Sequence, residues 1–177
     1  MNLKSVLIDE NTFGRMLKRI SHEIIEKNSD LGNLCLVGIK TRGVPIANRI
    51  SKYIFEIEGK RIPVGSLDIS SYRDDIPKTK PTLLNESSID FEITEKNIIL
   101  VDDVLYTGRT VRAALDAILS FGRPAKIQLA VMVDRGHREL PIRPDYIGKN
   151  IPTSQKELIH VSIKECDNID AIELFEI

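Results

Sequence analysis

Two adjacent carboxylates, followed by a Thr-Gly turn, are the residues of this chain best suited to chemistry. Residues 98–114 read IILVDDVLYTGRTVRAA, in which Asp102 and Asp103 follow an apolar run and Thr107 to Thr110 open a helical pattern. In open α/β sheets, ligands bind beyond the carboxyl ends of the strands, and a helix N-terminus attracts anions. Gly108 would let the backbone approach a phosphate closely. The segment predicts a site for a phosphorylated ligand whose hydroxyl groups or metal ion meet the two acids.

The run Gly108, Arg109 and Thr110 also resembles the Gly-Lys-Thr ending of a nucleoside triphosphatase P-loop. That motif needs a glycine five residues before Gly108, where this chain has Asp103, and a lysine where it has Arg109. The P-loop interpretation is therefore excluded. Two solvated acids that cap a helix would explain an isolated Asp-Asp pair, but not the whole run.

The elements that position this segment follow from the pattern of apolar residues. With 177 residues, 42% of them hydrophobic and 29% charged, the chain fits one compact domain and not a disordered or fibrous protein. The patterns predict buried strands over 34–39, 62–70, 98–101 and 125–133, helices over 9–27, 43–55 and 111–119, and further strand-like runs over 158–163 and 171–177. Residues 71–97 are polar and lack a period, so we expect a flexible loop or a short hairpin there. The alternation of strands and helices predicts an α/β domain with a mainly parallel sheet.

Charge and cysteine content restrict the partners and the cellular compartment that we expect for this chain. The 25 Lys and Arg residues against 26 Asp and Glu give a net charge of −1, so a polyanionic partner would need a local basic patch. Cys35 and Cys166 lie far apart and form no CxxC motif, which favours a reducing compartment. The chain shows no signal-peptide pattern and no apolar run of membrane-spanning length. We therefore expect a cytoplasmic protein with no membrane partner.

The segment 98–114 resembles the phosphoribosyl pyrophosphate (PRPP) binding motif of type I phosphoribosyltransferases. The resemblance implies a single domain over 1–177 with the type I phosphoribosyltransferase fold, a mainly parallel central sheet flanked by helices and a small hood from about 134–177. It also implies that Asp102 and Asp103 hold the ribose hydroxyls and meet Mg²⁺, directly or through PRPP. The 5-phosphate would lie in the turn formed by Val104, Leu105, Tyr106, Thr107, Gly108, Arg109 and Thr110.

A second match lies at residues 37–43 (VGIKTRG), where this family places its pyrophosphate loop. The resemblance implies that Lys40, Thr41 and Arg42 bind the departing pyrophosphate, with Lys40 and Arg42 acting in catalysis. Tyr72 and Arg73 open the long loop that closes over the site in such enzymes, and we expect them to take part in catalysis.

The segment 144–152 (PDYIGKNIP) resembles the part of the hood that holds the nucleobase in hypoxanthine-type relatives. It implies that Tyr146 stacks on the base, that the Ile147 backbone hydrogen-bonds the base edge, and that Arg135 belongs to the substrate site. Purine enzymes have an acid where this chain has Tyr106 and a lysine where it has Asp134. These two residues favour uracil over hypoxanthine.

Over nearly its whole length the chain is most similar to family members that regulate pyrimidine operons by attenuation and also convert uracil and PRPP to UMP and pyrophosphate. This implies binding of a pyrimidine leader RNA when UMP or UTP is bound, and assembly into a homodimer or larger homo-oligomer. The residues predicted to contact RNA are Lys18, Arg19, His22, Thr41, His137, Arg138, Arg143 and Lys149. Basic helix faces are most often simply solvated, so a purine salvage phosphoribosyltransferase without an RNA function stays open as the alternative.

Overall fold

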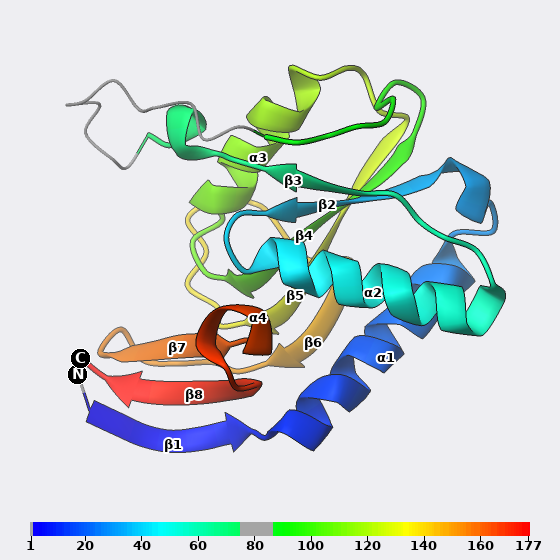
Figure 1. The fold of residues 1–177 in the computed structure, drawn as a ribbon. Coiled ribbons are helices and arrows are strands. Elements are labelled where there is room, and N and C mark those ends of the chain that lie inside the picture. Colours follow the sequence, from blue (N-terminus) through cyan, green and yellow to red (C-terminus); the bar gives the residue numbers. More distant parts are fainter. Residues whose placement is uncertain (1, 75–86) are drawn as a thin grey trace.

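The computed structural model describes residues 2–74 and 87–177, so part of the predicted loop over 71–97 lies outside the described residues. Figure 1 shows a layered α/β arrangement. The strands are β1 (Asn2–Ile8), β2 (Leu34–Ile39), β3 (Val64–Leu67), β4 (Asn97–Leu105), β5 (Lys126–Asp134), β6 (Tyr146–Asn150), β7 (Glu157–Ser162) and β8 (Ala171–Glu176). The helices are α1 (Glu10–Lys27), α2 (Gly43–Glu58), α3 (Arg109–Leu119) and the short α4 (Lys164–Asp167), with 3₁₀ turns at Leu31–Asn33 and Ser70–Tyr72.

The central sheet has five strands in the order β3-β2-β4-β5-β6, and every adjacent pair is parallel. Val37 lies beside Leu100, and Leu100 lies beside Leu129, so the three middle strands run in close register. Their carboxyl ends therefore meet at one edge of the sheet, where ligands bind in open α/β folds. The prediction of an α/β fold with a mainly parallel sheet is confirmed.

Alternate residues of β4 face two separate cores. Ile99 and Val101 pack with the buried stripes of α1 and α2, whereas Ile98 and Leu100 pack with α3 on the opposite face. Figure 1 shows the same division, with α1 and α2 on one side of the sheet and α3 on the other. Because both faces are covered, the strands are apolar at successive positions, and the edge that carries the acids is held rigidly.

A smaller antiparallel sheet has the order β1-β8-β7. The sequence-based hood contained only the C-terminal segment, and that prediction was incomplete because β1 pairs with β8, Asn2 lying opposite Glu176. Lys4 of β1 also forms an ion pair with Glu157 of β7, across the middle strand. Residues from both termini therefore build the hood.

Several predicted strand boundaries differ from those in the structure, at places where contacts with neighbouring strands determine the boundary. The strand expected over 62–70 shrinks to β3, and a 3₁₀ turn follows it. The strand expected over 98–101 extends through both acids, because Asp102 pairs with Val131 of β5. β6 was not predicted as a strand, since its residues gain their ladder partners only from β5. Helix α1 begins as predicted, with the Asp9 carboxylate accepting the Thr12 N–H at 2.8 Å.

Candidate active site

The two acids lie in the last part of β4, inside the sheet edge. Asp102 is only 8% exposed, and its Oδ1 accepts the Asp103 backbone N–H at 2.9 Å. The Asp103 carboxylate is half-buried and accepts the Val104 N–H at 2.7 Å. Burial, together with the neighbouring Asp103 carboxylate, raises the pKa of Asp102 well above its usual range. The buried Asp102, with its raised pKa, and the half-buried Asp103 thus lie next to each other, and this arrangement suits hydrogen bonding to a diol.

The turn after β4 forms a cradle at the start of α3. Gly108 adopts a left-handed conformation with φ 94° and precedes the first helical residue, as the need for close backbone approach predicted. The Thr107 Oγ1 accepts the Arg109 N–H at 3.4 Å. A cavity of about 360 Å³ lies here, and its lining includes every residue from Val104 to Val111 together with Arg73 and Glu139. The predicted turn residues are therefore brought together around one space of phosphate-binding character.

The loop after β2 lies beside the acids. Its Lys40 N–H donates to the Leu67 carbonyl at 2.9 Å, and the Lys40–Thr41 peptide bond is cis. Arg42 precedes α2, and its guanidinium donates to both Asp167 oxygens, at 2.9 and 3.2 Å. This hydrogen bonding raises the pKa of Arg42, and the Asp103 carboxylate acts in the same direction. The predicted pyrophosphate loop thus places a cation near the acids, with a carboxylate of the tail attached to it.

Tyr72 and Arg73, which were predicted to act in catalysis at the start of the long loop, have different surroundings in the structure. Arg73 lines the phosphate cavity, and its charge opposes the rise in the Asp102 pKa. The Tyr72 hydroxyl instead bonds to the Ser120 Oγ, at 3.3 Å, beyond the far end of α3. An eleven-residue helix is about 16 Å long, so the Tyr72 hydroxyl lies away from the phosphate turn in this structure, and its part in catalysis stays a prediction.

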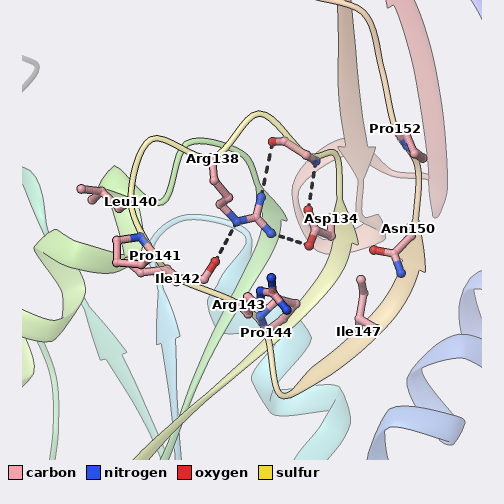
Figure 2. A pocket seen from close by; sticks show the side chains of 11 residues that line it. Asp134, Arg138, Leu140, Pro141, Ile142, Arg143, Pro144, Ile147, Asn150 and Pro152 are labelled. Carbon is pink, nitrogen blue, oxygen red and sulfur yellow. Dashed lines mark hydrogen bonds and ion pairs between the residues drawn. The ribbon is translucent and has the colours of Figure 1, made fainter.

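A larger cavity of about 870 Å³ lies beyond the ends of β5 and β6. Figure 2 shows Asp134 and Arg138 paired on one side of it, with Arg143 and Pro144 below and Ile147, Asn150 and Pro152 on the opposite wall. Leu140, Pro141 and Ile142 complete an apolar side. The cavity has apolar walls and a few polar groups, and its lining includes Asp134 and Ile147, which were predicted to bind substrate.

Tyr146 does not reach this cavity. Its side chain is fully buried on the α1 side of the sheet, where the hydroxyl accepts the Asn28 amide N–H at 2.9 Å. The predicted stacking of Tyr146 on a base is therefore wrong, since strand alternation turns its ring into the core. The Ile147 carbonyl accepts the Arg19 Nη2 at 2.9 Å, so this oxygen is already engaged.

Tyr106, which lines the smaller cavity, forms a compact group with Arg135 and His137. The Arg135 guanidinium lies 4.1 Å from the centre of the Tyr106 ring, and His137 meets the same ring edge-on. Arg135 is 5% exposed and donates to the Glu157 carbonyl at 2.7 Å. Arg135 therefore holds the Tyr106 ring in place, and its buried guanidinium has little surface left to contact a ligand.

The residues predicted to bind RNA fall into two groups. Arg19 donates to the Ile147 and Gly148 carbonyls, and Arg138 is turned into the larger cavity. His137 is exposed, and its Nε2 bonds to the Thr153 carbonyl. Arg19 nevertheless keeps 48% of its side chain exposed. The other predicted residues are exposed as well: Lys18, His22, Thr41, Arg143 and Lys149.

Sequence reasoning missed several functional positions. Asp167, which holds Arg42, lies in a tail segment that gave no motif. Glu139 forms an ion pair with Arg109 at 2.6 Å and lines the phosphate cavity. The run LPIRP at 140–144 could have indicated the wall of the larger cavity, since its two prolines restrict the backbone of this loop.

Among residues 2–74 and 87–177, no cluster of three or more His, Cys, Asp or Glu side chains is arranged to hold a metal ion. Asp102 and Asp103 alone would leave most of the coordination of Mg²⁺ to oxygens of the substrate or water. In the same part of the chain, no helix is both long and apolar enough to cross a bilayer. Cys35 is buried and Cys166 exposed, and both are free thiols.

Comparison with known sequences agrees with this geometry. Residues 7–165 match the model of the phosphoribosyl transferase domain. The chain is 58% identical over 174 residues to the Bifunctional protein PyrR of Clostridioides difficile strain 630, covering 98% of each protein. It is 56% identical over 179 residues to the Bifunctional protein PyrR of Bacillus cereus strain AH820, covering 99% of each.

Solved structures share the fold at lower identity. A hypoxanthine-guanine phosphoribosyltransferase of Bacillus anthracis superposes with a TM-score of 0.73 at 22% identity, over 98% of each chain. The hypoxanthine phosphoribosyltransferase of Trypanosoma cruzi gives a TM-score of 0.75 at 15% identity, over 98% of this chain and 97% of that one. The type I phosphoribosyltransferase fold predicted from the sequence is therefore confirmed.

Proposed function

The chain belongs to the phosphoribosyl transferase domain family and, within it, to the PyrR proteins, and from this premise we propose that it converts uracil and PRPP to UMP and pyrophosphate. We further propose that it binds a pyrimidine operon leader RNA when UMP or UTP is bound, and so regulates transcription attenuation. Residues 1–177 would act as one phosphoribosyltransferase domain in the cytoplasm. The observation that carries the enzymatic part is the position of the two acids, with the phosphate cavity and the larger cavity at the same sheet edge.

The phosphate and ribose of PRPP fit the end of β4. The 5-phosphate would lie in the cavity of about 360 Å³, where Gly108 exposes the backbone N–H groups at the start of α3. The next group along the substrate is the ribose, whose two hydroxyls would meet Asp102 and Asp103. Each hydroxyl would donate a hydrogen bond to a carboxylate oxygen of one of the two acids. Such paired contacts fix the ribose carbon at which the bond to pyrophosphate breaks.

The loop after β2 would receive the departing pyrophosphate. Lys40 is exposed, and the Arg42 guanidinium lies within electrostatic range of Asp103. Negative charge develops on the leaving pyrophosphate, so preorganised cations at this point stabilise the transition state. Mg²⁺ bound to PRPP would supply further positive charge, held mainly by the oxygens of the substrate, with Asp102 and Asp103 nearby. Arg73 adds a positive charge on the phosphate side.

The larger cavity would hold uracil. Leu140, Ile142 and Ile147 provide apolar walls for a planar ring, and Asp134 provides an acceptor for a ring N–H. Tyr106 adds a bulky phenol ring on the phosphate side of the site, and this ring is held against Arg135. A small pyrimidine fits this combination better than a purine. The purine salvage alternative has support only from structures of 15–22% identity, which carry the fold alone.

A competition assay tests the choice of base. Purified protein with Mg²⁺ and PRPP is offered equimolar uracil, hypoxanthine and guanine, and the nucleotides are separated by chromatography. We expect UMP as the main product. Preferential formation of a purine nucleotide would contradict the proposal. Replacement of both Asp102 and Asp103 by Asn should abolish UMP formation, and normal turnover in that variant would remove the ribose assignment.

The RNA function needs a separate test, because a working enzyme need not bind RNA. A gel shift of a pyrimidine leader hairpin, with and without UMP, should show retardation only with the nucleotide, and this retardation should weaken as salt rises. No retardation under any nucleotide condition would contradict the regulatory part. Light scattering of the same sample tests the proposed homodimer or larger homo-oligomer.

A further inference from the structure

Arg138 lies among the residues predicted to bind RNA, yet its guanidinium points into the protein. The Nε donates to the Ile142 carbonyl at 2.8 Å, and the Nη1 donates to the Tyr106 carbonyl at 2.8 Å and to the Gly136 carbonyl at 3.4 Å. The Nη2 forms an ion pair with the Asp134 carboxylate, and the side chain is only 20% exposed. Figure 2 shows this group spanning the loop beside the larger cavity. An arginine with these donors engaged is poorly placed to bind an RNA phosphate.

The partners of Arg138 belong to two different parts of the site. Tyr106 lies in the phosphate turn, whereas Asp134 and Ile142 line the larger cavity. Main-chain bonds join the same two parts, since the Thr107 carbonyl accepts the N–H groups of Glu139 and Leu140 at 2.9 and 3.2 Å. The guanidinium is thus a side-chain cross-link between the phosphate turn and the loop over 134–142.

We propose that Arg138 is a positioning residue that holds the phosphate turn and the base cavity in register, so that UMP is bound as one unit. This inference rests on the proposed function. The planar fork of arginine satisfies carbonyls and a carboxylate in several directions at once, whereas lysine offers a single point of charge. Arg138 therefore acts on RNA binding only through the nucleotide. Arg143, which is exposed at the rim of the same cavity, remains available to the RNA.

The test measures hairpin RNA affinity as a function of UMP concentration. The proteins compared are wild type, Arg138→Lys, Arg138→Gln and the control Arg123→Gln, which removes an exposed arginine at the start of the segment leading to β5. Arg138→Lys keeps a positive charge beside Asp134, so an effect shared by both variants does not come simply from leaving Asp134 unpaired and unfolding the loop over 134–142. Thermal unfolding of each protein is recorded alongside, and the KM values for uracil and PRPP are measured separately.

We expect both Arg138 variants to need about ten times more UMP for half-maximal RNA binding, because charge-assisted hydrogen bonds that shape the nucleotide site are lost. At saturating UMP, their RNA affinity and its salt dependence should match wild type within about twofold. The KM for uracil and the KM for PRPP should both rise, since the cross-link joins the larger cavity to the turn that would hold the 5-phosphate. Arg123→Gln should match wild type in every measurement.

A direct RNA contact predicts the opposite pattern. Arg138→Gln would then lose affinity at saturating UMP, with the slope of log K against log salt reduced by about one, and Arg138→Lys would retain both. An unchanged UMP midpoint in both variants would also overturn the inference. Wild-type protein that binds neither UMP nor the hairpin would overturn the proposed function itself, and this is recognised before any variant is compared.

Discussion

Replacing Asp102 by Asn should make the ligand-free protein more stable while it destroys activity. The Asp102 carboxylate is 8% exposed and lies beside Asp103, and its Oδ1 accepts the backbone N–H of that residue. Asn keeps the shape and the Oδ1 acceptor but removes the charge. Desolvation of an ion inside a protein costs several kcal/mol, of which local polar groups and Arg73 offset a part.

We estimate a net gain of about 1.5 kcal/mol for Asp102→Asn at pH 8. For a chain of 177 residues this corresponds to a rise of about 3 to 6 °C in the unfolding temperature. The size of this gain depends on pH. Because the folded-state pKa of Asp102 is raised, the folded protein binds a proton that the unfolded chain releases, and wild-type stability falls as pH rises from about 4 towards that raised value.

The assay is thermal unfolding of wild type and Asp102→Asn without ligands, from pH 4 to pH 8. The difference in unfolding temperature should be near zero at pH 4, where wild-type Asp102 is protonated, and largest at pH 8. A matched Asp103→Asn variant should gain less, because that carboxylate is half-buried. A difference that stays constant with pH, or that favours wild type at pH 8, would refute the reasoning.

Three further substitutions test the fold and the corrected site. Tyr146→Phe removes the hydrogen bond to Asn28 and should cost about 1 kcal/mol in urea unfolding, with the KM for uracil unchanged; a raised KM would restore Tyr146 to the base site. Arg49→Met leaves the buried Asp170 carboxylate without its arginine and should cost about 3 kcal/mol in the same assay, whereas a cost below 1 kcal/mol would show that this pair is solvent-screened. Gly43→Ala would place a Cβ 2.2 Å from a β4 carbonyl oxygen, so we expect a loss of about 3 kcal/mol or insoluble protein, and unchanged unfolding would contradict the close packing of α2 on the sheet.

Local signals predicted the phosphate turn because its parts are adjacent in the chain. The strand, the two acids, the glycine with positive φ and the helix start all fall within residues 98–114, so spacing alone specifies their geometry. The first helix was predictable for a similar reason, since its buried residues recur at helical spacing and Asp9 caps it. The residues that specify each of these elements therefore lie within the element itself or next to it in the sequence.

The failures involve partners distant in sequence. Strand β1 has its ladder partner in β8, more than 160 residues later, and its own residues show no clear alternation. Tyr146 belongs to the core because Asn28, at the end of α1, binds its hydroxyl. A Tyr in a polar segment gives no indication of which face of a strand it will occupy until the neighbouring strand is known.

The directions of the basic side chains also change what the net charge of −1 implies for RNA binding. Among the predicted RNA residues, Arg19 and Arg138 are bound to protein carbonyls, although the Arg19 side chain is 48% exposed. The other lysines and arginines of this set, Lys18, Arg143 and Lys149, are exposed. Each cation that neutralises a phosphate contributes about −0.7 to −0.9 to the slope of log K against log salt. One subunit should therefore give a slope of about −2 to −3, which is shallow for a nucleic-acid-binding protein. A slope near −4 per subunit would mean that both arginines turn outward onto the RNA. A shallow slope instead requires the hairpin to be selected by base and loop contacts, which fits a regulator that must ignore other RNA.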